Sequence, residues 1–77
     1  MRNIVLVTGG AGYIGAHVCK ALATQGYVPV VFDDFSSGHR EAVRWGVVVE
    51  GDIRDAAAVD RTFRMFRPDS VVHLAGR

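Results

Sequence analysis

The residues best suited to chemistry are the glycines between positions 9 and 15. They follow a run of apolar, mostly β-branched residues at 4–7 and precede a helical pattern, which predicts a strand, a tight turn and the start of a helix. The first backbone N–H groups of a helix have no partner within it, and the helix dipole adds partial positive charge there. A diphosphate is the ligand that suits such a turn.

The glycine spacing has two interpretations. Gly10, Gly12 and Gly15 fit a pattern with one and then two intervening residues, whereas Gly9, Gly12 and Gly15 fit a looser pattern with two residues in each gap. Gly12 and Gly15 belong to both patterns, so either one lets a phosphate approach the backbone and lets the helix pack closely on the strand. The alternative is a glycine-rich turn that binds no ligand.

Two acidic residues, Asp33 and Asp34, lie at the carboxyl end of the second predicted strand. Asp33 is placed to accept hydrogen bonds from an adenosine ribose diol, and it disfavours a 2′-phosphate, which predicts NAD rather than NADP. Asp34 adds negative charge and strengthens that preference, although Arg40 in the following loop is a competing phosphate partner. A solvated aspartate at a strand end is the alternative interpretation of Asp33.

Two later segments complete the predicted dinucleotide site. Asp52 follows Gly51 just after the third predicted strand, where it would accept a hydrogen bond from the adenine amine while Ile53 packs on the ring. A loop aspartate that prepares the next helix is the competing interpretation. The small residues of 74–76 would let the central part of the cofactor pass close to the backbone, although a simple turn would have the same sequence.

The other polar residues carry less chemistry. His73 lies in an apolar strand and is predicted to be a packed core residue, and His17 and His39 lack the carboxylate or cysteine partners of a metal site. Cys19 is predicted to pack as a small apolar residue. No metal site is predicted. The arginines of the second helix are expected on a solvated surface: Arg61, Arg64 and Arg67.

These residues need a scaffold, and strand and helix patterns alternate along the chain. Strands are predicted at 3–8, 28–33, 47–49 and 70–74, and helices at about 12–25 and 56–66. Firm pairing of the second strand is expected only from Val30, because Pro29 cannot donate to a ladder. A short helix is one interpretation of 39–45. The fold class is therefore α/β: a Rossmann-like parallel sheet, N-terminal half only, with the strands in the order 3-2-1-4.

Each helix has an expected buried stripe and an expected boundary. Gly26 should end the first helix and Asp55 should cap the second. The first stripe is Ile14, Val18, Ala21 and Leu22, with His17, Lys20 and Gln25 towards solvent. The second stripe is Val59, Phe63 and Phe66.

Composition bounds the class of protein. Of the 77 residues, 49% are hydrophobic and 22% are charged, which is typical of a soluble globular domain. The net charge is only +1, so the overall electrostatic potential does not favour binding to nucleic acid or to an anionic membrane surface. One cysteine excludes an internal disulfide. No signal sequence is expected, and no apolar run comes near the roughly 20 residues of a membrane span. A reducing, cytoplasmic location is expected, with neither nucleic acid nor membrane as partner.

In order along the chain, these motifs resemble the extended short-chain dehydrogenase/reductases, and among them the UDP-glucose 4-epimerase family. The similar segments are 7–15 (VTGGAGYIG), 32–38 (FDDFSSG), 51–55 (GDIRD) and 72–76 (VHLAG). The resemblance covers essentially the whole chain. It is specific for the superfamily and less so for the epimerases, because sugar-nucleotide dehydratases share much of this region.

The resemblance implies NAD as cofactor and a role for each matching position. Tyr13 and Ile14 would line the diphosphate turn, residues 33–38 would surround the adenosine ribose, and residues 74–76 would border the nicotinamide side. Asp34 replaces the asparagine common in the family and, as a carboxylate, cannot donate a hydrogen bond. The expected cofactor-binding residues are Gly9, Gly12, Tyr13, Ile14, Gly15, Asp33, Asp34, Phe35, Ser36, Ser37, Gly38, Asp52, Ile53, Leu74, Ala75 and Gly76.

The catalytic residues that the resemblance implies are missing. Such enzymes use a serine or threonine and a Tyr-x-x-x-Lys pair, but here Tyr13 and Tyr27 precede His17 and Val31 at that spacing, and the single lysine is Lys20. We therefore expect residues 1–77 to be the N-terminal half of an NAD-binding domain, inactive alone. The whole enzyme would interconvert UDP-glucose and UDP-galactose through a 4-keto intermediate. Alternatives are a fragment of another sugar-nucleotide dehydratase or epimerase, or a non-catalytic dinucleotide-binding module.

The fourth predicted strand has a further consequence. It should lie inside the sheet of an intact fold, so in a truncated chain residues 71–74 would form an uncovered edge. This edge predicts that the chain pairs with a second copy, in a homodimer or larger self-association. The resemblance implies a nucleotide sugar as the partner of the whole enzyme.

Overall fold

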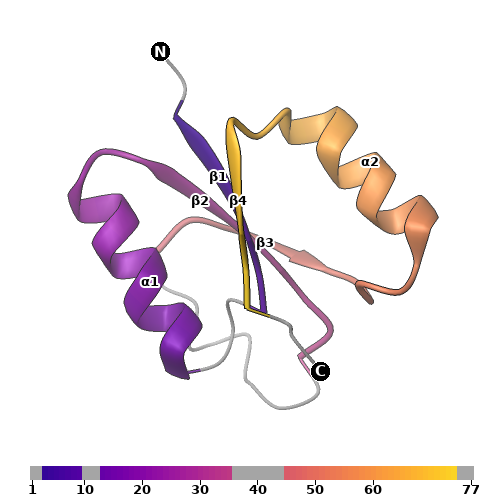
Figure 1. Ribbon diagram of the computed structural model, residues 1–77, viewed down its shortest axis with the longest axis horizontal. Coiled ribbons are helices and arrows are strands. Elements are labelled where there is room, and N and C mark those ends of the chain that lie inside the picture. Colours follow the sequence, from indigo (N-terminus) through magenta and orange to yellow (C-terminus); the bar gives the residue numbers. More distant parts are fainter. Residues whose placement is uncertain (1–2, 10–12, 36–44, 75–77) are drawn as a thin grey trace.

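The computed structural model describes residues 3–9, 13–35 and 45–74. Its elements are β1 (Ile4–Thr8), α1 (Tyr13–Thr24), β2 (Val28–Asp33), β3 (Val47–Glu50), α2 (Ala56–Phe66) and β4 (Ser70–His73). The strands run parallel in the order β3-β2-β1-β4, and α1 and α2 lie on opposite sides of the sheet (Figure 1). The α/β class and the Rossmann-like strand order are confirmed.

The core has two halves because alternate residues of β1 and β2 point to opposite faces of the sheet. Every residue of β1 is buried, as expected for a strand with a helix over each face. On the α2 face the buried residues are Ile4, Leu6, Val30 and Phe32, against Val49, Ala58, Val59 and Phe66. On the α1 face they are Val5, Val7, Cys19 and Val31, against Leu22, Val72 and Leu74.

Helix α1 is rotated relative to the predicted stripe. Ile14 is 66% exposed and Cys19 only 1% exposed, and Gly15 is buried with Cys19, so the prediction for Cys19 is confirmed and those for Ile14 and Ala21 are wrong. The small residues Gly15 and Cys19 lie on the side of α1 that faces the sheet, because small side chains let the helix approach the strands closely. The helix ends at Thr24, and Gly26 two residues later supplies the predicted left-handed stop, with φ +92°.

Helix α2 also confirms its boundaries and corrects its stripe. Asp55 caps it, accepting hydrogen bonds from the N–H groups of Ala57 and Ala58 at 3.1 and 3.3 Å. Thr62 is 4% exposed, whereas Phe63 is 40% exposed. Thr62 is buried at little cost because its hydroxyl donates to the carbonyl of Ala58 at 2.9 Å.

The pairing of β2 begins earlier than Pro29 suggested. Val28 pairs with Ile4, and Pro29 with Val5. The Val28 N–H donates to the carbonyl of Asn3 at 2.9 Å. Because successive residues of a strand direct their backbone groups to opposite sides, the nitrogen of Pro29 points towards β3. The pairing of β2 with β3 begins only at Val30. The missing donor of Pro29 therefore costs no bond to β1. The interpretation of 39–45 as a helix lies outside the described residues, apart from Trp45, which is in a bend.

Candidate functional site

Backbone hydrogen bonds also connect the residues that directly follow the strands to the carboxyl ends of the neighbouring strands. Gly9 donates to the carbonyl of Phe32 and Gly51 to that of Asp33, both at 2.9 Å, and Leu74 donates to Thr8 at 2.8 Å. Each bond holds the first residue after a strand against the neighbouring strand. The loops of the predicted site therefore start from fixed points along one edge of the sheet, where open α/β sheets bind their ligands.

The glycine turn begins and ends within the described residues. Gly9 has φ +80°, a conformation that favours glycine, and α1 begins at Tyr13. Ile14 is in the first turn and exposed, so its side chain is available to a ligand at the helix start rather than used in the core. Residues 10–12, which include Gly12 and its predicted role, lie outside the described residues.

Asp33 ends β2 and is partly buried. Its Oδ1 accepts a hydrogen bond from the Phe35 N–H at 2.8 Å, which orients the carboxylate and turns the chain, and Phe35 adopts φ +60°. Glu50 is its register partner on β3, and Asp34 is exposed. The predicted ribose residues Ser36, Ser37 and Gly38 lie outside the described residues.

Asp52 has a partner that the sequence reasoning missed. Its Oδ1 accepts from the N–H and the Nε of Arg54 at 2.8 and 3.1 Å, and its Oδ2 accepts from a terminal guanidinium nitrogen of Arg54 at 2.8 Å. These hydrogen bonds, side chain first, lower the pKa of Asp52 to about 2. The Asp-x-Arg spacing was the available signal. Ile53, between them, is 39% exposed.

His73 lies at this edge and is not a core residue. The prediction of a packed histidine is wrong: His73 is exposed, because its strand β4 has a neighbour on one side only within the described sheet. Its Nδ1 lies 2.6 Å from the hydroxyl of Thr8, which is 3% exposed. The contact joins the ends of β1 and β4 beside Leu74. Ala75 and Gly76 lie outside the described residues.

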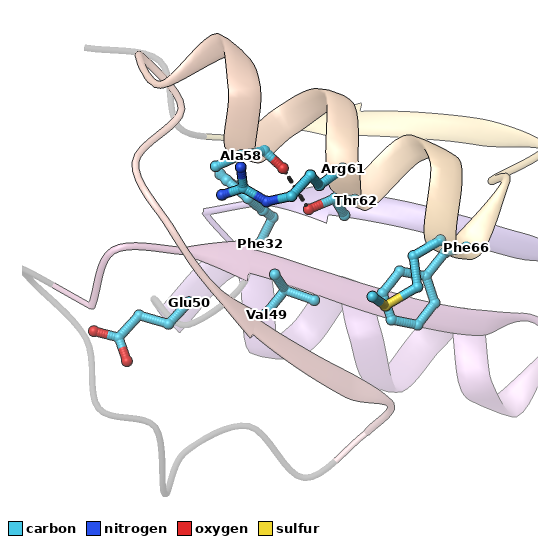
Figure 2. A pocket seen from close by; sticks show the side chains of 8 residues that line it. Phe32, Val49, Glu50, Ala58, Arg61, Thr62 and Phe66 are labelled. Carbon is cyan, nitrogen blue, oxygen red and sulfur yellow. Dashed lines mark hydrogen bonds between the residues drawn. The ribbon is translucent and has the colours of Figure 1, made fainter.

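A separate hollow of about 210 Å³ lies between α2 and the strands β2 and β3 (Figure 2). Apolar side chains form most of its wall, with Glu50 and Arg61 among its polar residues. It contains none of the predicted cofactor residues, so it is distinct from the strand-end site. Its lining residues are Phe32, Val49, Glu50, Ala58, Arg61, Thr62, Met65 and Phe66.

Among residues 3–9, 13–35 and 45–74, no group of three or more His, Cys, Asp or Glu side chains is arranged to hold a metal ion. Within the same residues, neither helix has the length and apolar character needed to cross a membrane.

Comparisons with known proteins agree with this architecture. A family model described as "NAD dependent epimerase/dehydratase family" matches residues 5–77. A UDP-glucose 4-epimerase from Rhizobium leguminosarum bv. trifolii is 59% identical over 71 residues, which cover 92% of this chain and 22% of the relative.

Solved structures have the same fold. UDP-glucose 4-epimerase from Brucella ovis, in complex with NAD, matches with a TM-score of 0.91 and 56% identity over 94% of this chain and 22% of its own. The Thermotoga maritima enzyme with UDP-glucose matches with a TM-score of 0.89 and 41% identity, over 96% and 24%. This chain thus spans less than a quarter of each of these relatives. It belongs to the NAD dependent epimerase/dehydratase family.

Proposed function

We propose that this chain forms the NAD-binding part of a UDP-glucose 4-epimerase, with residues 1–77 as the N-terminal half of its Rossmann domain. The observation that carries the proposal is the placement of Asp33. Its carboxylate is oriented by the Phe35 N–H, and its own carbonyl is bonded to Gly51. A carboxylate fixed at this edge beside glycine backbone suits an adenosine ribose next to a diphosphate.

The described residues fit NAD by the chemistry of their donors and acceptors. Asp33 and Asp34 would accept hydrogen bonds from the ribose diol, and Ile53 offers an exposed apolar surface for the adenine beside Asp52. Gly9 and the start of α1 would face the diphosphate, and Leu74 would border the nicotinamide side. The remaining predicted contacts stay proposals: Gly12, Ser36, Ser37, Gly38, Ala75 and Gly76. When bound, NAD supplies a hydride acceptor for the sugar carbon.

Replacing Asp33 by asparagine tests this assignment. The amide of Asp33→Asn keeps an oxygen for the Phe35 N–H but loses the charge, so NAD binding should weaken about tenfold, the order of a charge-assisted hydrogen bond. NAD is titrated into the 77-residue chain and followed by backbone amide NMR shifts at the strand ends. Asp60→Asn is the matched control, because Asp60 is an exposed carboxylate on α2, paired with Arg64.

Two results would contradict the assignment. Absence of shifts at Gly9, Asp33 and Gly51 at millimolar NAD would exclude the site. Equal weakening by Asp33→Asn and Asp60→Asn would show that the effect is general electrostatics.

We also propose that the chain has no epimerase activity alone. The resemblance assigns proton transfer to a Tyr-x-x-x-Lys pair, and neither Tyr13 nor Tyr27 has a lysine at that spacing. A nucleotide sugar is the proposed substrate of the whole enzyme. A cytoplasmic location, with no nucleic acid or membrane partner, completes the proposal, supported by a net charge of +1 and a single cysteine.

The backbone of β4 supports self-association of this chain as a proposal. Leu74 donates to Thr8, so by alternation Val72 also faces β1 while Val71 and His73 turn their N–H and C=O groups outward. No strand of the described sheet lies on that side, and Val71 is 46% exposed. If β4 of a second copy paired antiparallel with this β4 about a two-fold axis at Val72, Val71 of each chain would lie opposite His73 of the other. Each of these Val71–His73 pairs could then exchange two backbone hydrogen bonds.

Sedimentation velocity tests this association. We expect the 77-residue chain to dimerise and Val71→Lys to be monomeric, because an edge lysine opposes strand addition. Met65→Lys is the control, since Met65 is an apolar residue on α2 that is 72% exposed. A monomeric parent chain with a sharp, cooperative melting transition would refute the proposal.

A further inference from the structure

Arg54 is a positively charged residue held in a fixed place just after β3, at the carboxyl ends of the strands. Its guanidinium forms a two-point pair with Asp52 through Nε and a terminal nitrogen, at 3.1 and 2.8 Å. The backbone N–H of Arg54 binds the same carboxylate, so the side chain is anchored at both ends. Such forked pairs fix the plane of the guanidinium as well as its distance. The Arg54 side chain is nevertheless 86% exposed, so it remains accessible to an anion.

The surroundings of Arg54 are acidic. Asp33 and Glu50 are register partners on adjacent strands, Asp34 follows Asp33, and Asp52 lies two residues beyond Glu50. Gly51, which directly precedes Asp52, donates its N–H to the carbonyl of Asp33 at 2.9 Å, so the segment that carries Arg54 begins beside the end of β2. The charge of Asp34 accordingly contributes, after the hydrogen bond and charge of Asp52, to raising the pKa of Arg54. Arg54 therefore partly offsets the charge of Asp34, which the proposed function places at the adenosine ribose, as well as that of Asp52 beside the adenine.

We infer that Arg54 sets how strongly this site discriminates between NAD and NADP, by offsetting the repulsion that the strand-end carboxylates exert on a ribose 2′-phosphate. The inference rests on the proposed NAD site and adds a specificity-determining residue to it. Without Arg54, the carboxylates repel every anionic ligand more strongly. The effect is larger for NADP, because its extra phosphate charge belongs to the ribose beside Asp33 and Asp34.

The experiment compares the dissociation constants of NAD and NADP for the 77-residue chain, measured by NMR titration at neutral pH and low salt. For Arg54→Gln we expect the ratio of the NADP to the NAD constant to rise about fivefold, the size of one exposed charge interaction. Arg54→Lys, which keeps the charge, should leave the ratio within about twofold of the parent. Arg64→Gln is the matched control: it removes the same charge from an arginine paired with an aspartate, Asp60, at 2.9 Å.

The pKa of Asp52 is a second readout that needs no cofactor. In the parent chain it is about 2, and in Arg54→Gln it should return towards the ordinary value of 3.8, as followed by the carboxyl ¹³C shift. A carboxyl with a lowered folded pKa stabilises the fold above its unfolded pKa and loses that contribution as pH falls through the folded value. The pair is therefore fully formed at neutral pH and lost between about pH 4 and pH 2.

Each outcome separates the inference from the proposed function. An unchanged ratio in Arg54→Gln, or a fall in it, overturns the inference while NAD binding by the parent chain upholds the site. An Asp52 pKa that stays near 2 in Arg54→Gln shows that Arg54 does not hold Asp52, and also overturns the inference. If the parent chain binds neither dinucleotide, the proposed site fails and the role of Arg54 fails with it.

Discussion

Replacing Gly46 by alanine is expected to cost at least about 3 kcal/mol of folding stability, at the upper end of single-residue effects. Gly46 has φ +113°, and a Cβ there would lie 2.1 Å from the carbonyl oxygen of Pro29 and 2.9 Å from its carbonyl carbon. Both atoms are backbone of β2, a strand paired on both sides, so neither can move away cheaply. The measurement is urea unfolding of the chain followed by far-ultraviolet circular dichroism.

Gly26 provides the matched control for Gly46. It has a similarly left-handed φ of +92°, but a Cβ there meets nothing within 4 Å. Gly26→Ala should therefore cost only the backbone strain, about 1–2 kcal/mol. Equal losses in Gly26→Ala and Gly46→Ala would show that the contact with Pro29 relaxes freely and that strain alone is measured.

Gly51→Ala is expected to cost about 2 kcal/mol through overpacking. A Cβ at Gly51 would lie 2.6 Å from Cζ and 2.8 Å from Cε2 of Phe32, whose side chain is buried in the core. Gly51 has no left-handed φ, so the cost is steric. Because Gly51 also donates to the carbonyl of Asp33, the substitution should disturb the amide signals of Asp33 as well as lower the urea midpoint.

A double-mutant cycle with Phe32→Leu isolates this steric contact. Leucine is shorter than phenylalanine, so Gly51→Ala should cost less in the Phe32→Leu background, with a coupling of about 1 kcal/mol. Strict additivity of the two substitutions would locate the cost of Gly51→Ala elsewhere than at the Phe32 ring.

Local patterns predicted most of the architecture. The buried run of β1, the Asp55 cap and the stop at Gly26 are short-range features, because a strand face, a cap and a left-handed turn depend on a few neighbouring residues. Strands that alternate with helices admit few connections, so the parallel sheet and its order also followed. The strand-end location of Asp33 and Asp52 came from the same reasoning.

The errors concern which side of an element meets the core. Ile14 and Phe63 are more apolar than Gly15 and Thr62, yet they are exposed while the small or self-bonded residues are buried. Hydrophobicity ranks residues, but the distance between helix and sheet decides which side chain fits. His73 was assigned to the core because its neighbours are apolar, and the position of β4 at the edge of the described sheet exposed it.

By itself, the sequence determined the parallel α/β fold, its strand order and the acidic and glycine-rich strand ends, since these depend on residue type and on spacing along the chain. Only the tertiary structure decided that Arg54 holds Asp52, that Thr8 meets His73 and that Gly46 abuts Pro29. The last two contacts join residues from different strands or loops, and the first depends on a rotamer that spacing does not specify. Distances between such groups are set by register, twist and packing, which no single segment encodes.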